Sequence, residues 1–301
     1  MVGFGENSVD LLTVVAEHPA PNSKQRVQRF GRLPGGQIAT ALATCARLGF
    51  RTRYIGSFGA DELGALSRCS LDEAGVDLTA SRVVAGATNQ FAVILVDARS
   101  GQRCVLWDRH PALTMEPPDL PLDAVRSGRM LLVDCNAPAA AAHAARQARE
   151  AGIPTAVDVE KVRPGITELL QHIDAIIAAE EFPPALTGHE QLGKSLETIG
   201  RDFGARLVCA TLGSKGSLAW CNGREIRTSA FPVDCVDSTG AGDAFRGAFA
   251  SACLRAPDGE LEDALTYANA VAGLNCRALG ARGGLPSAAE VEQLLLTFPG
   301  M

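Results

Sequence analysis

Residues 233–249 read VDCVDSTGAGDAFRGAF, and they place Gly240, Ala241 and Gly242 directly before one acid, Asp243. Glycine accepts a positive φ and lets a ligand approach the backbone, so these small residues predict a sharp turn. Apolar side chains then recur with helical spacing, at Phe245, Ala248, Phe249 and Ala252. The first amides of a helix have no intrahelical partner and carry the positive end of its dipole. The stretch therefore predicts a phosphate cradle at a helix N-terminus, with Asp243 in its first turn.

The overall composition is that of an ordinary soluble protein. The chain has 301 residues, 47% of them apolar, and its formal net charge of −6 argues against a nucleic-acid or anionic-membrane partner. Nine scattered cysteines without a C-x-x-C pair indicate reduced thiols rather than disulfides or a zinc site. The N-terminus lacks the basic region of a signal peptide, and no uncharged stretch approaches the ~20 residues that span a bilayer. We expect a cytoplasmic protein.

Strand-like and Ala-rich helical runs alternate along the chain. The runs that predict strands are residues 9–15, 54–56, 130–134, 155–159, 175–178 and 207–211. The runs that predict helices are residues 38–48, 62–74, 139–151 and 192–203. This alternation predicts an α/β fold in which a mainly parallel sheet is covered on both faces.

One region departs from this alternation. Residues 90–108 form two apolar runs joined by a hairpin-like turn at 97–101, and residues 25–33 are also strand-like. These segments predict a small antiparallel flap beside the main sheet. We therefore expect a single domain over residues 1–301, with a lid formed by segments of roughly 11–34 and 86–112.

Two further glycine patterns resemble phosphate-binding loops but lack the required context. Residues 188–195, GHEQLGKS, match the P-loop pattern, yet two prolines and two acids precede them instead of a buried strand. We interpret this segment as a solvated helix start with an exposed Lys194. Residues 3–8, GFGENS, begin like a dinucleotide fingerprint, but Ser8 stands where the third glycine is required and a strand-like run follows. We expect no Rossmann site there.

Residues 237–243, DSTGAGD, resemble the C-terminal signature of the ribokinase (PfkB-type carbohydrate kinase) family. Residues 35–49, GGQIATALATCARLG, resemble its N-terminal signature, and residues 56–64 match its usual G-x-x-G-x-D-x-x-G. Two signatures in the right order make the match specific, and it covers essentially the whole chain. Within the family the sequence is most similar to ketohexokinase-like members, through residues 158–161, 229–232 and 271–276.

The resemblance implies a three-layer α/β/α sandwich with a small β lid, and transfer of the γ-phosphate from ATP, with Mg²⁺, to a hydroxyl of a small sugar. Asp243 falls on the base that takes the proton from this hydroxyl. Gly240, Ala241 and Gly242 fall on the anion hole, and Arg103 resembles a lid arginine that approaches the phosphate. Because a helix N-terminus favours an anion, we expect Asp243 to be ionised near neutrality without a raised pKa.

The same resemblance assigns the binding residues. Asp10 falls on the acceptor of sugar hydroxyls, and Gly35 and Gly36 fall on the turn beside the sugar. Gln37 and Thr40 occupy sugar-contacting positions of the signature. The family usually has Asn at the position of Thr40, and the ketohexokinase-like branch also has Asn at that of Gln37, so the identity of the sugar stays open. The positions that match the nucleotide-binding loop and the helix near adenine are Thr211, Gly213, Gly216 and Asn269.

Three expectations are less complete matches. The N-x-x-E metal motif of the family is altered, and Glu180 or Glu181 would hold metal-bound waters in its place. Residues 280–284, GARGG, resemble part of a loop for a monovalent cation such as K⁺, although an ordinary turn explains them equally well. A lid of this kind can cover its own site or pair with the lid of a second copy in a homodimer.

Two alternative functions remain at this point. Phe91 and Trp107 in the predicted lid would supply aromatic surface for a nucleoside, so a nucleoside kinase is the alternative within the class. The altered metal motif and Thr40 would also suit a catalytically silent sugar- or nucleotide-binding protein of the same fold, whereas the intact Gly-Ala-Gly-Asp run favours an enzyme.

Overall fold

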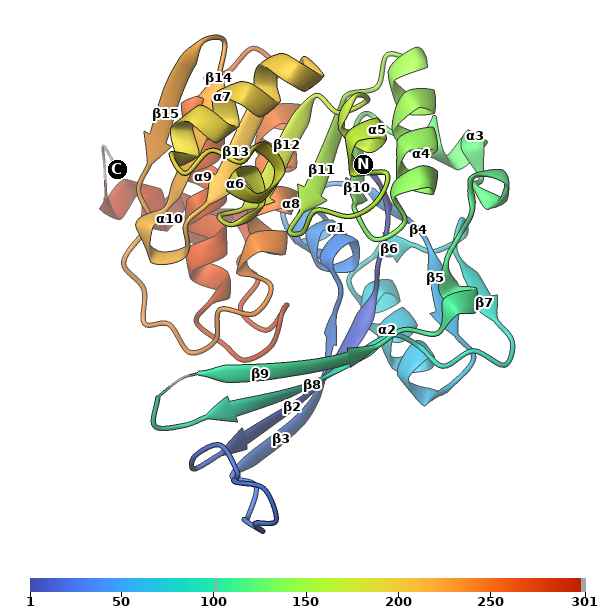
Figure 1. Cartoon of the computed structure of the whole chain (residues 1–301), viewed down its shortest axis with the longest axis vertical. Helices are drawn as coiled ribbons and strands as arrows, with labels where there is room; N and C mark the ends of the chain where they lie inside the picture. The colour runs from blue at the N-terminus through green and yellow to red at the C-terminus, as the bar shows by residue number, and fades with distance from the viewer. Residues whose placement is uncertain (101, 299–301) are drawn as a thin grey trace.

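The computed structural model describes residues 1–100 and 102–298, so Gly101 of the predicted 97–101 turn lies outside the described residues. Its centre is a nine-stranded sheet in the order β15-β14-β13-β12-β11-β10-β1-β4-β6 (Figure 1). The strands are β1 Val2–Phe4, β4 Thr52–Ile55, β6 Val76–Asp77, β10 Leu131–Asp134, β11 Thr155–Val159, β12 Ala175–Ala179, β13 Leu207–Thr211, β14 Ser217–Cys221 and β15 Arg224–Thr228. All neighbours pair parallel except β13–β14 and β14–β15.

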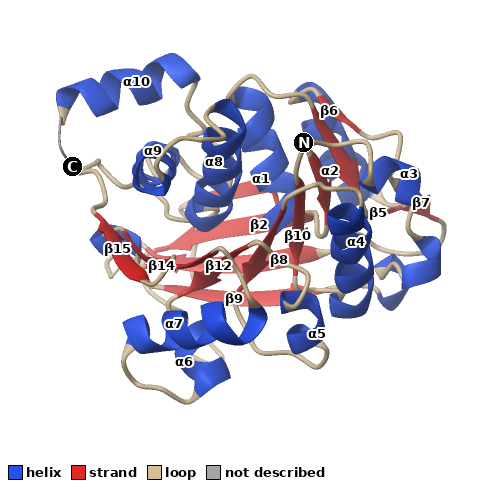
Figure 2. Cartoon of the chain, turned by 90° about the horizontal axis from the view of Figure 1, so that it is seen from above, coloured by secondary structure: helices blue, strands red, loops and turns tan. Residues whose placement is uncertain are grey.

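Helices cover both faces of this sheet, as Figure 2 shows. The helices are α1 Gln37–Arg47, α2 Glu62–Glu73, α3 Leu122–Val125, α4 Pro138–Glu150, α5 Ile166–Leu170, α6 Phe182–Thr187, α7 Leu192–Phe203, α8 Ala241–Arg255, α9 Leu261–Asn275 and α10 Ala288–Thr297. One buried apolar core lies between the sheet and α1, α8 and α9, and a second lies between the sheet and α4, α5 and α7. The expected three-layer α/β/α sandwich is confirmed.

A separate four-stranded sheet projects from this body as the lid (Figure 1). Its strands are β2 Ser8–Val15, β3 Arg29–Gly35, β8 Phe91–Asp97 and β9 Arg103–Asp108. They lie in the order β3-β2-β8-β9, and β2 pairs parallel with β8 while the two outer pairs are antiparallel. A third, two-stranded sheet pairs β5 Ser57–Gly59 in parallel with β7 Arg82–Val84.

The first strand requires a correction. We counted residues 9–15 among the alternating strands and expected the lid to begin at about residue 11, but the whole run, Ser8–Val15, is β2 of the lid. The first central strand is instead β1, Val2–Phe4, which is buried and too short to show a strand pattern in the sequence. The chain leaves β1, passes through residues 5–7 and enters the lid at once, so this junction connects the two sheets.

No helix in the described part of the chain is long and apolar enough to cross a membrane.

Candidate active site

The turn before α8 has the conformation that its glycines predict. Gly240 caps the helix with a φ of 73°, and a Cβ at this position would lie 2.4 Å from the carbonyl oxygen of Ala281. Asp237 stabilises the turn. Its carboxylate accepts hydrogen bonds from the backbone amide of Thr239 at 2.9 Å and from that of Gly280 at 2.8 Å. The 280–284 loop and the predicted anion hole are thus packed against each other.

Asp243 lies in the first turn of α8, but its protonation differs from our expectation. Burial raises the pKa of Asp243 to about 7, and Glu160 and Asp10 act in the same direction, while Arg246 and Arg282 oppose them. The expectation of an unshifted pKa was wrong, since the loss of hydration outweighs the favourable helix N-terminus. A carboxyl group that titrates near neutrality is well matched to proton transfer at neutral pH.

Asp10 lies in the middle of β2 with only 7% of its surface exposed. Gly35 is its close neighbour on β3, where a Cβ would lie 2.8 Å from Oδ2 of Asp10, so only glycine leaves this carboxylate room. Burial raises the pKa of Asp10 to about 6, and Arg282 and Arg103 oppose this. Gly36, with a φ of 92°, then turns the chain into α1.

Thr40 does not line the site in the way that we expected. Its side chain is completely buried on α1, and its Oγ1 accepts a hydrogen bond from Nε of Arg282 at 3.2 Å. Arg282 also donates to the carbonyl oxygen of Gly35 at 2.7 Å and to Oγ of Ser70 at 3.0 Å. Thr40 therefore holds Arg282, and Arg282 supports the turn beside the predicted sugar position.

Arg282 is a site residue that the sequence analysis missed. Burial lowers the pKa of its guanidinium to about 10, and Asp243 and Asp10 raise it. Arg282 in turn lowers the pKa of both acids, so the three side chains interact electrostatically with one another. Residues 280–284 resemble part of a monovalent-cation loop or form an ordinary turn, and the structure places the cationic side chain of Arg282 within them. The presence of one arginine within that glycine-rich segment was the available signal.

Arg103, at the start of β9, connects the lid to the turn. Its Nη1 donates to Oγ1 of Thr239 at 3.2 Å, directly before Gly240. The lid residue that we expected to approach a phosphate therefore lies beside the predicted anion hole.

The predicted nucleotide residues lie at and beyond the end of β13. Thr211 ends this strand, and Gly213 and Gly216 shape the following loop with φ values of 56° and 87°. Asn269 is placed differently: it is buried on α9, and its Nδ2 donates to Oγ of Ser217 at 3.1 Å and to Oγ1 of Thr228 at 2.8 Å. Both amide hydrogens of Asn269 are therefore used in hydrogen bonds to β14 and β15, and the side chain stabilises the packing of α9 on these strands.

Glu180 and Glu181 are exposed directly after β12. Within residues 1–100 and 102–298, no group of three His, Cys, Asp or Glu side chains could hold a metal ion. A magnesium ion commonly keeps several waters and binds through one or two carboxylates together with substrate phosphates. The exposed pair therefore fits a water-mediated role and not a protein cage.

The P-loop-like segment has the structure of an ordinary helix start. It follows helix α6 instead of a strand, and Gly193 and Lys194 already belong to the first turn of α7. Ser195 is buried and its hydroxyl donates to the carbonyl oxygen of His189, while Lys194 is exposed. The backbone therefore does not form a loop that wraps a phosphate.

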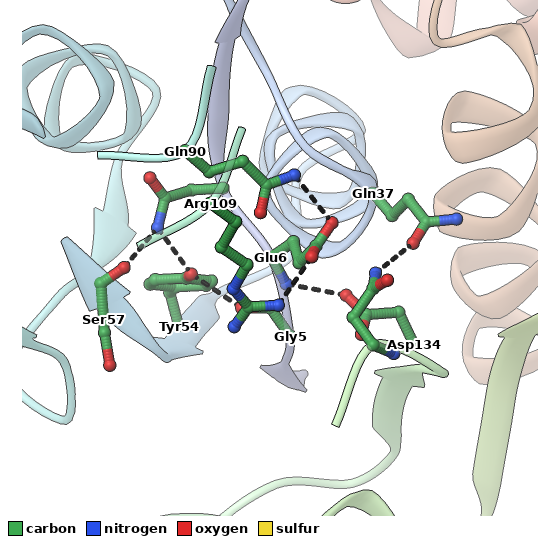
Figure 3. Close-up of polar contacts among 10 residues, drawn as sticks. Gly5, Glu6, Gln37, Tyr54, Ser57, Gln90, Arg109 and Asp134 are labelled. Atoms are coloured by element: carbon green, nitrogen blue, oxygen red, sulfur yellow. Dashed lines mark hydrogen bonds and ion pairs between the residues drawn. The ribbon is translucent and has the colours of Figure 1, made fainter. Parts of the chain in front are cut away.

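A buried polar cluster joins the lid to the body (Figure 3). Glu6 lies between β1 and β2, and it accepts hydrogen bonds from Nε2 of Gln90 at 2.9 Å and from Nη1 of Arg109 at 2.6 Å. Gln90 directly precedes β8 and Arg109 directly follows β9. The amide of Glu6 donates to Asp134 at the end of β10 at 2.6 Å. Three of the connections between the two sheets therefore meet at Glu6.

The carboxyl groups of this cluster are strongly perturbed. Burial and the nearby Asp134 raise the pKa of Glu6 to about 7, and Arg109 opposes this. Beside them, Gln37 at the start of α1 accepts a hydrogen bond from Nδ2 of Asn136 at 2.8 Å. Gln37, which we expected to contact a sugar, is thus paired with a residue after β10.

Comparison with known proteins assigns the family. Residues 1–288 match the model described as pfkB family carbohydrate kinase. The chain is 31% identical over 298 residues to an ATP-dependent ribose-1-phosphate kinase of Halopiger xanaduensis, covering 98% of this chain and 97% of the relative. It is 27% identical to a probable fructokinase-4 of Arabidopsis thaliana, covering 98% and 96%. The structure of Arabidopsis thaliana ribokinase complexed with ribose and ATP aligns with a TM-score of 0.83 at 28% identity, covering 98% and 97%.

The chain therefore belongs to the pfkB family of carbohydrate kinases. It is an ATP-dependent sugar kinase, a phosphotransferase whose acceptor is an alcohol group. These relatives are named for ribose 1-phosphate, fructose and ribose, so they do not specifically support the narrower likeness to ketohexokinases.

Proposed function

We propose that this kinase transfers the γ-phosphate of ATP to a hydroxyl of a small sugar, with Asp243 as the general base. The observation that carries the proposal is the position of Asp243 in the first turn of α8 beside the Gly240 turn, where its side chain is 14% exposed and its pKa is raised to about 7. A base with this pKa is about half ionised at neutral pH and still binds a proton well.

The remaining residues have complementary roles in this proposal. Asp10 accepts hydrogen bonds from neighbouring sugar hydroxyls, because an ionised carboxylate has several acceptor positions. Asp243 accepts the proton of the attacking hydroxyl. The free amides at the start of α8 and the guanidinium of Arg103, beside Thr239, neutralise the charge that develops on the transferred phosphoryl group.

The chain has residues that suit the nucleotide and its metal. Thr211, Gly213 and Gly216 would form one side of the ATP site, beyond the end of β13. Glu180 and Glu181 would hold waters of a magnesium ion, which when bound neutralises phosphate charge. Arg282 supplies a positive charge within the 280–284 loop that resembles part of a K⁺ site, so we do not assign a monovalent cation to the mechanism.

A nucleoside acceptor is the second candidate, and the register of the lid sheet favours it. Asp10 pairs with Ala92 and Ala92 with Trp107, so Trp107 lies on the same face of the lid as Asp10. Trp107 is 62% exposed there and offers aromatic surface to a base. Phe91, by contrast, alternates to the other face.

The opposite face of the lid presents apolar side chains to solvent. Phe30 is 59% exposed and Leu106 is 63% exposed, and both lie on the face away from Asp10. Such exposed apolar groups on one sheet favour contact with another protein surface. We propose that two copies pair through this face of the lid.

A substrate panel tests the proposed function. Purified protein with ATP and Mg²⁺ is offered pentoses, ketohexoses, sugar phosphates, sugar acids and nucleosides, and ADP release is measured. We expect ADP release with a small sugar. Release with nucleosides alone would establish the second candidate, and the absence of release with the whole panel would favour the catalytically silent binding protein.

A further inference from the structure

The buried arginine on α8, Arg246, has no part in the roles proposed above. It follows Asp243 by one helical turn, and its side chain is only 7% exposed. Its Nη1 lies 3.4 Å from Oδ1 of Asp243. A Cβ on Gly242 would lie 2.7 Å from the same Nη1, so the guanidinium contacts the helix turn that carries the predicted anion hole.

A second buried acid fixes this guanidinium from the other side. Nη2 of Arg246 lies 2.6 Å from Oδ1 of Asp158 on β11, and the side chain of Asp158 is 1% exposed. A buried charge is costly unless it is paired, so neither Arg246 nor Asp158 is stable there without the other. β11 is an interior strand of the central sheet, and it therefore gives Arg246 a rigid anchor.

We propose that Arg246, anchored by Asp158, is a positioning residue for the catalytic base: it holds the carboxylate of Asp243 against the turn and places a positive charge beside it. This inference rests on the proposed role of Asp243 as the base. Arg246 itself need not touch the sugar or ATP.

The surroundings of Asp243 determine the direction of the effect. The charged groups that influence it are Arg246 on the same helix, Glu160 after β11, Asp10 on the lid and Arg282 in the 280–284 loop. Asp158 interacts with Asp243 as well, so without Arg246 three acids and the single arginine Arg282 would remain. Burial has already raised the pKa of Asp243, and the loss of the Arg246 guanidinium raises it further.

The test compares Arg246→Met with Arg246→Lys in two measurements. The first is the pH dependence of kcat/KM, which reports the free enzyme. The second is the titration of Asp243 followed by ¹³C NMR of labelled aspartate, with Asp243→Asn identifying its signal. We expect Arg246→Met to move the acid limb and the NMR titration together to higher pH by about one unit. At pH 7 this is about a fivefold loss of kcat/KM, and the loss diminishes as the pH rises. Arg246→Lys should recover part of both shifts, and KM for ATP should change less than about twofold in either variant, because Arg246 acts in the chemical step.

Folding requires its own control, because Arg246→Met leaves Asp158 buried without its partner. The double variant Asp158→Asn with Arg246→Met removes both charges of the pair and avoids this penalty. Because Asp158 and Asp243 also interact, the double variant is compared with Asp158→Asn alone. Relative to that variant it lacks only the guanidinium, and it should show the same two shifts.

The outcomes separate this inference from the proposed function. An NMR titration of Asp243 that is the same in the double variant as in Asp158→Asn alone overturns the role of Arg246, whatever happens to kcat/KM. A shifted titration with an unshifted acid limb of kcat/KM shows that the two side chains interact but that Asp243 is not the base, and the proposed function then fails. A loss of kcat that is equal at every pH, with no shift of titration, indicates a merely structural arginine and also overturns the inference.

Discussion

The acid limb of the pH–rate profile is the property that most clearly separates a buried base from an exposed one. With the pKa of Asp243 at about 7, the ionised fraction falls about tenfold for each pH unit below neutrality. At pH 5 we therefore expect kcat/KM to be about 100-fold below its plateau. With the ordinary value of 3.8, less than about a tenth of the rate would be lost at pH 5.

Two other carboxyl groups titrate in the same range and shape the design of this experiment. Asp10, with a pKa of about 6, must also be ionised to accept from the sugar, so the limb should steepen below pH 6. Glu6, with a pKa of about 7, belongs to the lid–body cluster and not to the predicted chemistry. Glu6→Gln is the matched control, and it should keep the acid limb near pH 7.

Loss of activity at pH 5 should not result from unfolding. The pKa values of Asp243, Glu6 and Asp10 are raised in the folded state, so the folded protein binds more protons than the unfolded chain in this range. Their contribution to stability is fully present below the unfolded pKa of about 4 and is lost as the pH rises through about 6 to 7. A hydrogen bond from the Thr79 hydroxyl lowers the pKa of Asp77 to about 2. The contribution of Asp77 to stability is therefore lost as the pH falls, but only below about pH 4.

The assay measures initial rates of ADP release between pH 5 and 9, with circular dichroism melting at each pH as the control for folding. A flat profile between pH 5 and 8, with unchanged melting, would refute the assignment of Asp243 as a buried base.

Three substitutions test separate parts of the site. Gly240→Ala should lower both kcat and the melting temperature. It forces a φ of 73° on an alanine, which costs about 1–2 kcal/mol, and places the new Cβ against the carbonyl oxygen of Ala281. Normal activity of this variant would contradict the tight turn. Arg282→Met should raise KM for the sugar about tenfold or more, while KM for ATP changes little. The reason is that the Arg282 guanidinium, which donates to Thr40, also donates to the Gly35 carbonyl in the turn beside the sugar. Equal effects on the two KM values would argue against this role. Lys194→Ala should leave ATP affinity unchanged in a calorimetric titration, because Lys194 is exposed on α7; a loss of ATP binding would revive the P-loop reading.

Local sequence patterns were sufficient for the central elements. β11 at Thr155–Val159, β13 at Leu207–Thr211 and α7 at Leu192–Phe203 have the boundaries that the sequence predicts. Buried parallel strands are short apolar runs, and α7 has one apolar face, so each has a local signature. The hairpin of β14 and β15 was missed although Asn222-Gly223 connects them with positive φ values of 50° and 81°, a dipeptide that is typical of a tight hairpin.

The site was predictable where function depends on the backbone and not where it depends on long side chains. The glycines of residues 240–242 indicate the turn directly, and Asp243 follows them in sequence. Arg282, however, reaches Thr40 across 242 positions in the chain, and Arg246 meets Asp158 from another element. The raised pKa of Asp243 has the same origin, because burial results from tertiary packing that no local pattern records.

The most direct test of the central claim is sugar-dependent ADP release by Asp243→Ala and Asp243→Asn beside the unchanged protein. If Asp243 is the base, both variants should lose about 100-fold or more of kcat, as expected for a general base, while ATP still binds and the fold still melts cooperatively. Sugar-dependent ADP release at an unchanged rate in either variant would show that another group accepts the proton.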